Sequence, residues 1–299
     1  MKKLLFAILF VGAFFVLSFL LTQRFFAVQQ TSQTDPKKIS VVASFYPLYF
    51  FAQNIGGSFA KVTNLTPAGS EPHDYDPSPQ QISNIVQSKL LILNGKGLEA
   101  WSEKIKQNLQ GKPVLVITTS EDVKATDPHL WLSPIQAKKQ VQKILQGFLQ
   151  VDPTHQTQYE QHAQMLTEQL EGLDTLYKKG LTNCKQNNIV TSHAAFGHLA
   201  EAYGLNQVSI SGISPDEEPS PAQLATVANF VKANHVTVIF FESLVSPKLS
   251  ETIARETGAR TAVLNPLEGL SDDEIQSGSD YFSVMKENLA TLRLALECR

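Results

Sequence analysis

A long helical pattern near the middle of the chain separates two similar series of strand and helix patterns. It extends from Asp152 to Lys179, with Pro153 near its start and Gly180 as its stop. Apolar residues recur on it every three or four positions, at Tyr159, Ala163, Leu166, Leu170, Leu173 and Tyr177, so they share one face. Such a helix would extend about 40 Å at about 1.5 Å per residue, which is more than one compact core requires. We therefore predict a linking helix, residues 152–180, that bridges two lobes; the alternative is a long helix packed on a single domain.

Each side of this helix contains short apolar runs that alternate with amphipathic helical patterns. The predicted strands are Ile39–Phe45, Lys61–Thr66, Leu90–Asn94 and Val114–Thr118 before it, and Asn188–Ser192, Gln207–Ser211, Val236–Phe241 and Arg260–Asn265 after it. This alternation is typical of parallel sheets covered by helices on both faces. The sequence thus predicts an α/β fold with an N-terminal lobe, residues 39–151, and a C-terminal lobe, residues 181–299. Ligands of such sheets bind beyond the carboxyl ends of the strands.

The N-terminus has the pattern of an export segment. Lys2 and Lys3 precede an apolar run from Leu4 to Leu21, which is long enough to span a bilayer. Lysines before such a run favour a cytoplasmic N-terminus and export of the remainder. We expect residues 1–27 to be an uncleaved anchor, with a cleaved signal as the alternative, and residues 28–38 to be a polar tether. The protein would then be extracytoplasmic and held at the membrane.

Charge and cysteine content bear on which partners the protein binds and on whether it contains a disulfide. The formal net charge is −3, and no block of like charge occurs, so nothing indicates nucleic-acid binding. Cys184 and Cys298 are the only cysteines, and an even pair in an exported protein indicates a disulfide. We expect a monomer.

Three histidines follow predicted strands. His73 lies in the loop after the second strand, His129 follows the fourth, and His193 directly follows the fifth. Three imidazoles with one carboxylate would form a nitrogen-rich tetrahedral set, which suits Zn²⁺ better than Mn²⁺ or Mg²⁺. Asp280, at the start of the last predicted helix, is the carboxylate we expect, although an acidic residue there could equally be an N-cap. Spacing alone makes this a weak signal, because the three histidines form no short metal motif.

These residues lie in sequence blocks that resemble the metal-binding solute-binding proteins of ABC importers, specifically the zinc branch of the cluster A-I family. The blocks are Glu71–Tyr75, Asn94–Trp101, Asp127–Pro134, Ser192–Gly197, Gly212–Ser220 and Asp280–Met285, in this order. The resemblance implies two α/β lobes bridged by one long rigid helix, with the metal in the cleft between them. It also implies His73, His129 and His193 as ligands, whereas the fourth ligand is Asp280, Glu71 or a water molecule.

The function that the resemblance implies is capture of Zn²⁺ and its delivery to an ABC permease, without enzyme activity. Relatives that carry manganese tend to have a glutamate at the position of His193, so histidine indicates zinc. A manganese receptor of the same family is the first alternative. A zinc hydrolase is the second, and it would need a general base beside a metal-bound water, for which Glu71 is the candidate. Glu242, after the seventh predicted strand, is expected to make structural hydrogen bonds.

Overall fold

The computed structural model describes residues 38–299, and every structural statement below concerns this part of the chain. Residues 39–299 form one compact unit. The predicted anchor, residues 1–27, and all but the last residue of the predicted tether lie outside the described residues. Among the helices of residues 38–299, none combines the length and the apolar character needed to cross a bilayer.

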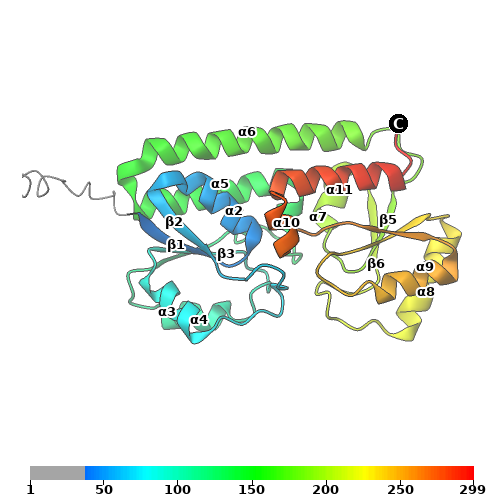
Figure 1. Cartoon of the computed structure of the whole chain (residues 1–299), viewed down its shortest axis with the longest axis horizontal. Coiled ribbons are helices and arrows are strands. Elements are labelled where there is room, and N and C mark those ends of the chain that lie inside the picture. The colour runs from blue at the N-terminus through cyan, green and yellow to red at the C-terminus, as the bar shows by residue number, and fades with distance from the viewer. Residues whose placement is uncertain (1–37) are drawn as a thin grey trace, which may run out of the picture. The chain divides into compact units, whose positions relative to one another are not determined.

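Two parallel four-stranded sheets with the same strand order form the centres of two lobes (Figure 1). The N-terminal sheet has the order β2-β1-β3-β4, with bounds Ile39–Ala43 (β1), Ala60–Asn64 (β2), Leu90–Leu93 (β3) and Leu115–Thr118 (β4). The C-terminal sheet has the order β6-β5-β7-β8, with bounds Asn188–Thr191 (β5), Asn206–Ser209 (β6), Val238–Phe241 (β7) and Arg260–Val263 (β8). The predicted α/β fold is confirmed, and each predicted strand is present.

Local caps explain where several helices begin. α3 (Pro79–Gln87) and α8 (Pro221–Ala233) both follow a serine, Ser78 or Ser220, whose side chain accepts a hydrogen bond from a glutamine N–H three residues later. The side-chain oxygen of each glutamine accepts the backbone N–H of the serine in return, which completes a capping box. Proline suits the first helical position because that N–H has no intrahelical partner. The other helices of the lobes are α2 (Tyr46–Gly56), α4 (Ser102–Asn108), α5 (Pro134–Val151), α7 (Gly197–Tyr203), α9 (Lys248–Thr257) and α11 (Tyr281–Ala295).

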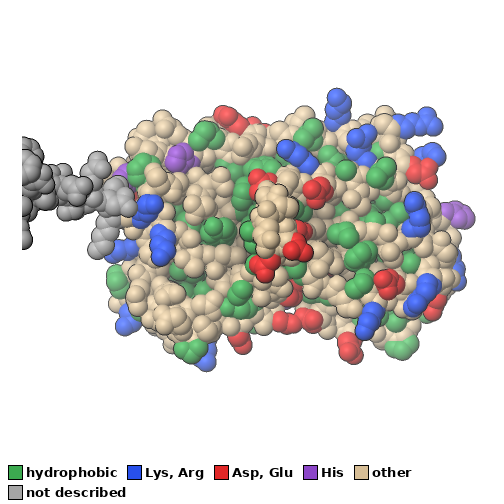
Figure 2. Space-filling model, in the orientation of Figure 1, with side chains coloured by type: hydrophobic (Ala, Val, Ile, Leu, Met, Phe, Trp, Pro, Cys, Tyr) green, Lys and Arg blue, Asp and Glu red, His purple; other side chains and the backbone are tan. Residues whose placement is uncertain are grey.

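A short helix that the sequence did not reveal, α10 (Asp272–Gln276), lies between β8 and α11. Ser271 caps it, and its first turn is acidic, with Asp272, Asp273 and Glu274. Acidic side chains near a helix N-terminus are favourable because the partial charge there is positive. In Figure 2, Asp and Glu side chains gather around this part of the molecule, whereas Lys and Arg side chains lie mostly toward its two ends.

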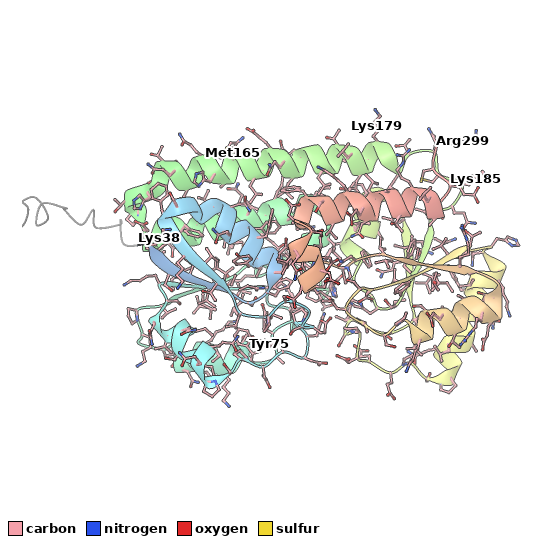
Figure 3. The ribbon with its side chains drawn as sticks, in the orientation of Figure 1. Lys38, Tyr75, Met165, Lys179, Lys185 and Arg299 are labelled. Atoms are coloured by element: carbon pink, nitrogen blue, oxygen red, sulfur yellow. A yellow bond between two sulfur atoms is a disulfide. The ribbon has the colours of Figure 1, made fainter. Side chains whose placement is uncertain are left out.

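The long helix is α6 (Gln156–Gly180), and it packs against α2, α5 and α11. The six apolar residues predicted to share a face are its buried residues. Figure 3 shows Met165 and Lys179 on the opposite side, pointing away from the lobes. The predicted start is wrong by a few residues, because Pro153–His155 form a short 3-10 helix first. Asp152 lies before this 3-10 helix, and its carboxylate accepts hydrogen bonds from His155 Nδ1 and from the Tyr159 hydroxyl, both at 2.7 Å.

One apolar core extends through both lobes along α2, α5, α6 and α11. The ring of Phe51 in α2 packs against that of Tyr281 in α11, with centroids 5.0 Å apart. The Tyr281 hydroxyl donates to the carbonyl oxygen of Trp131 at 2.5 Å, and all three side chains are fully buried. Full burial of a side chain such as Phe51 stabilises the folded state by about 1.5–3 kcal/mol. A wide rotation of one lobe against the other would therefore expose part of this core.

The predicted disulfide between Cys184 and Cys298 is present. It joins the segment before β5 to the chain end after α11, where Lys185 N and Gln186 N also donate to the carbonyl oxygen of Leu296. Figure 3 shows Lys185 at the same end of the molecule as the last residue. The C-terminus is thus held by a covalent bond and by backbone hydrogen bonds.

Candidate metal centre

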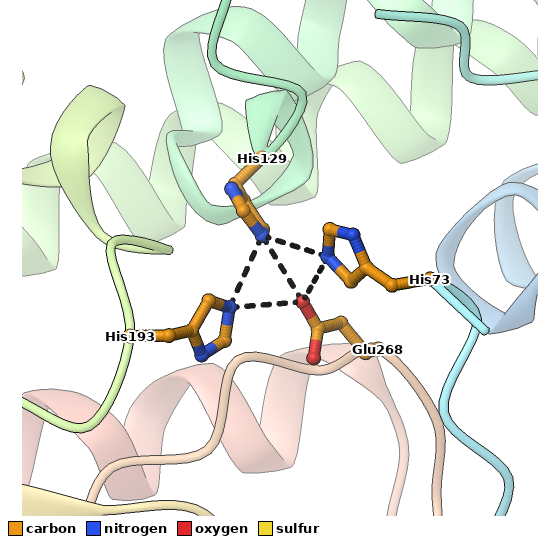
Figure 4. A group of neighbouring side chains, drawn as sticks. All are labelled: His73, His129, His193 and Glu268. Carbon is orange, nitrogen blue, oxygen red and sulfur yellow. Dashed lines mark hydrogen bonds and ion pairs between the residues drawn. The ribbon is translucent and has the colours of Figure 1, made fainter. Parts of the chain in front are cut away.

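Four side chains that follow strands of the two sheets converge on one point (Figure 4). His73 lies in the loop after β2, and His129 directly precedes a short 3-10 helix that follows β4. His193 follows β5, and Glu268 follows β8. The carboxyl ends of parallel strands meet at one edge of each sheet, which is where such folds bind ligands. Each lobe therefore contributes two of the four side chains.

The ligand atoms are the Nε2 atoms of the histidines and Oε1 of the glutamate, and they all lie within 4.8 Å of one another. Oε1 of Glu268 is 3.3 Å from Nε2 of His73, 3.1 Å from that of His129 and 3.3 Å from that of His193. Nε2 of His129 is 3.4 Å from that of His73 and 3.3 Å from that of His193. A tetrahedral Zn²⁺ ion with bonds of about 2.0–2.1 Å separates its ligand atoms by about 3.3–3.4 Å. Five of the six separations lie close to these values, and the sixth, between Nε2 of His73 and Nε2 of His193, is below 4.8 Å; the donor set therefore suits one such ion.

A carboxylate orients the ring of His129. Nδ1 of this ring lies 2.7 Å from Oδ1 of Asp127, which also accepts the His129 backbone N–H at 2.9 Å. A hydrogen bond at Nδ1 fixes the tautomer that leaves Nε2 as the metal-binding atom and raises its basicity. The neighbouring Leu130, Trp131 and Leu132 are buried, so the segment that carries the histidine is fixed by packing as well.

A second carboxylate orients His193 in the same way. Nδ1 of His193 lies 2.6 Å from Oε1 of Glu242, which also accepts from the hydroxyl of Ser192. The hydroxyl of Thr191 donates to the carbonyl oxygen of His193 at 2.7 Å. Glu242 therefore makes the hydrogen bonds expected of it, and one of them is directed at a ring of the candidate site.

The site is buried, and its charges are strongly coupled. His129 and His193 are fully buried, Glu268 is 1% exposed, and the side chain of His73 is 7% exposed. Burial opposes ionisation of Glu268, yet hydrogen bonds from His129, His193 and His73 hold the pKa of this carboxyl well below its usual range. Burial also opposes protonation of His193, but Glu242 and Glu268 raise its pKa to about 10. In the absence of metal, the Glu268 carboxylate thus lies beside the protonated ring of His193.

Glu71, one alternative for the fourth ligand, is not among the four converging residues. Its Oε1 accepts the backbone N–H of His73 at 3.2 Å. Burial, together with the nearby charge of Glu268, raises the pKa of Glu71 to about 9. This carboxyl is therefore protonated at neutral pH in the metal-free protein, and it would have to lose that proton before it could bind a cation.

The structure does not bring Asp280 to the three histidines. Oδ1 of Asp280 accepts the backbone N–H of Ser283 at 2.8 Å, and the serine side chain returns a bond to the Asp280 backbone. Asp280 is thus the N-cap of α11, and a carboxylate used in this way is not available to the centre. Glu268, rather than Asp280, is therefore the carboxylate that the structure places with the three histidines.

Glu268 was missed in the sequence, although one signal could have found it. It follows β8 after a four-residue connection that contains Asn265 and Pro266, just as His193 follows β5. The rule that ligands lie beyond the carboxyl ends of strands selects it as readily as the histidines. Its local neighbours carry no motif that distinguishes it from a structural glutamate.

Fold and site together define a two-lobed α/β protein with a candidate metal centre of three histidines and one glutamate. A family model described as "Zinc-uptake complex component A periplasmic" matches residues 41–295. The chain belongs to this family, which confirms the resemblance inferred from the six sequence blocks.

Relatives with assigned names support the same family. The zinc-binding lipoprotein AdcA of Streptococcus pneumoniae serotype 4 is 37% identical over 288 residues, which cover 89% of this chain and 57% of AdcA. The high-affinity zinc uptake system protein ZnuA of Bacillus subtilis is 38% identical over 280 residues, which cover 87% of this chain and 88% of ZnuA. The crystal structure of the Zn(II)-bound ZnuA-like domain of S. pneumoniae AdcA matches with a TM-score of 0.78 and 39% identity, over 87% of this chain and 99% of that domain. The chain thus spans little more than half of AdcA and most of ZnuA.

Proposed function

We propose that this protein is an extracytoplasmic receptor that captures Zn²⁺ and delivers it to an ABC importer. The observation that carries the proposal is the group of three Nε2 atoms and one carboxylate oxygen, five of whose six separations fit the edges of a zinc tetrahedron. Its ligands are His73, His129, His193 and Glu268. The names of AdcA and ZnuA, which describe zinc binding and zinc uptake, agree with this cargo.

The donor set favours zinc over manganese. Manganese prefers more oxygen ligands than a site with three imidazoles and one carboxylate supplies. Asp127 and Glu242 occupy the Nδ1 atoms of His129 and His193, so each of these rings presents Nε2 to the metal. A manganese receptor of the same family is therefore the weaker alternative.

A zinc hydrolase is disfavoured by the groups around the centre. Hydrolysis would require a general base within reach of a metal-bound water. Glu71 is the carboxyl proposed for that role from the sequence, but it is not among the side chains that converge on the centre. The four protein ligands would also fill a tetrahedral ion without a water. Binding and release, rather than catalysis, is the activity that this arrangement supports.

The proposed partner is the membrane permease of the importer. The proposed working form is a monomer that its N-terminal segment holds at the outer face of the cell membrane. That segment lies outside the described residues, so its role rests on the Lys2-Lys3 and Leu4–Leu21 pattern. The AdcA name, which describes a lipoprotein, supports attachment to a membrane in this family.

Metal titration of the purified full-length protein tests the proposal. Calorimetry should show one Zn²⁺ per chain, and His193→Ala should abolish or greatly weaken binding. His235→Asn is the matched control, because His235 is an exposed histidine of the same lobe and its positive φ of 51° is one that asparagine tolerates. Equal or tighter binding of Mn²⁺ would assign the protein to the manganese branch. Absence of a stoichiometric zinc site would refute the receptor proposal.

A further inference from the structure

The backbone immediately before Glu268 is in an unusual conformation. Leu267 has a φ of 57° and is fully buried. A residue with a branched side chain rarely adopts this left-handed region, because its Cβ lies too close to the carbonyl oxygen that follows. Such a conformation persists only where the surrounding structure imposes it. The segment Leu264–Leu270, here called the Glu268 loop, must therefore be held by specific contacts.

Two asparagine side chains supply those contacts. The Asn265 backbone N–H donates to Oδ1 of Asn288 at 2.9 Å, and Nδ2 of Asn288 donates to the Asn265 carbonyl oxygen at 2.7 Å. Oδ1 of Asn265 accepts the N–H of Leu267 at 2.8 Å, so it holds the strained residue directly. Both asparagines are almost completely buried, at 6% and 3% exposure. We call these two residues the asparagine pair.

The asparagine pair is anchored to elements that do not depend on the metal. Asn288 lies in the middle of α11, the helix that packs on α6. Nδ2 of Asn265 donates at 3.0 Å to Oε1 of Glu274, and Glu274 also completes the cap of α10. Asn265, near the start of the Glu268 loop, is thus hydrogen-bonded both to α11 and to α10.

The Glu268 loop also contacts the segments that carry two of the histidines. Nε1 of Trp131, two residues after His129, donates to the carbonyl oxygen of Pro266 at 2.7 Å. The N–H of Gly69, in the loop of His73, donates to the carbonyl oxygen of Leu270 at 2.9 Å. The loop therefore sets the position of the carboxylate relative to ligands of the other lobe.

We propose that Asn265 and Asn288 are positioning residues for the metal site: they impose the left-handed turn at Leu267 and so hold the Glu268 carboxylate at tetrahedral distance from the three histidines. This inference rests on the proposed zinc site. Without the asparagine pair, Leu267 would relax toward negative φ, and the next residue would turn away from the histidines. Partners of a metal ligand that act in this way typically alter metal affinity by about 10- to 100-fold.

A double-mutant cycle tests the inference in the full-length protein. Zinc affinity is measured by competition with a chelating dye for the wild type, Asn288→Ala, Glu268→Ala and the double variant. Asn288→Ala alone should weaken zinc binding by about tenfold. In the Glu268→Ala background the same substitution should have no further effect, because no carboxylate remains to be positioned. Val284→Ala, a buried truncation one turn away on α11, controls for general destabilisation and should leave affinity unchanged.

Each outcome decides the inference. An unchanged affinity in Asn288→Ala, or an equal loss with and without Glu268, overturns it while leaving the zinc site intact. Failure of the wild type to bind zinc would instead refute the proposed function. If Asn288→Ala does not fold, Glu274→Ala takes its place in the cycle, because Glu274 is only half-buried and holds Asn265 from the surface. A loss of affinity in Glu274→Ala that depends on Glu268 supports the inference, and an unchanged affinity overturns it.

Discussion

Zinc binding to the metal-free protein should release at least one proton at pH 7. Both ring nitrogens of His193 lie beside carboxylates, Nδ1 at 2.6 Å from Glu242 and Nε2 at 3.3 Å from Glu268. Burial alone would lower the pKa of His193, but the two carboxylates raise it to about 10. The ring is therefore an imidazolium at pH 7, and Zn²⁺ can bind only after the Nε2 proton has left.

The same shifts give the size and the sign of the pH dependence. His129 is also between two carboxylates, Asp127 and Glu268, and they raise its pKa although burial acts in the opposite direction. Binding should therefore release about one to two protons, one from His193 and up to one from His129. A raised pKa means that protons compete with the ion more strongly as the pH falls. Lowering the pH from 8 to 7 should weaken zinc binding by about 10- to 100-fold, a factor of about ten for each proton released.

Calorimetry at pH 7 in buffers of different ionisation enthalpy counts the released protons directly. Glu242→Gln should reduce the count, because the loss of the charge beside Nδ1 lowers the pKa of His193. Glu297→Gln is the matched control, since Glu297 pairs with Lys185 at the surface, remote from the centre, and the count should not change. Tight zinc binding by the wild type without proton release would show that His193 is neutral in the metal-free protein, and would refute this reasoning.

Two further substitutions separate stability from binding. Replacing Cys184 and Cys298 together with serine should lower the free energy of unfolding by up to about 4.8 kcal/mol, because the disulfide closes a loop with a sequence separation of 114. Urea unfolding measures this loss, and an unchanged free energy of unfolding would contradict it. Asp280→Ala should lower the free energy of unfolding by about 1 kcal/mol, because it removes the cap of α11 at Ser283. Its zinc affinity should be unchanged in the dye competition, and a loss as large as that of Glu268→Ala would restore Asp280 as a ligand.

The strands were predictable because their signal is local. Apolar runs such as Ile39–Ala43 and Leu90–Leu93 are strands of a parallel sheet, and their length and spacing exclude most other folds. The positions of His73, His129 and His193 followed from the same pattern, since each comes after a strand. Their convergence did not follow from it, because it depends on how the two sheets face each other, which no short segment encodes.

Two separate physical reasons explain why the sequence selected Asp280 rather than Glu268 as the proposed fourth ligand. Asp280 precedes Ser283 by three residues at a helix start, and this pattern serves a capping box as well as a metal site. The direction of Glu268, in contrast, depends on a left-handed turn at Leu267 that leucine does not favour. The Leu267 N–H donates to the side chain of Asn265, and Asn265 is held in turn by Asn288, 23 residues further along the chain. Sequence reasoning places side chains well where local preference agrees with the fold, and fails where a distant contact overrides it.

For the proposed receptor, we expect release of the ion to come from movement of loops rather than from rotation of the lobes. α6 packs on helices of both lobes, and the core that includes Phe51 and Tyr281 would be exposed by a wide hinge rotation. The ligands, in contrast, all lie on connections that follow strands. Two of these connections, the Glu268 loop and the loop of His73, are joined by the hydrogen bond from Gly69 to Leu270. A partner that displaced one of them would disturb a ligand from each lobe at once, so a small local movement is sufficient to open the tetrahedron.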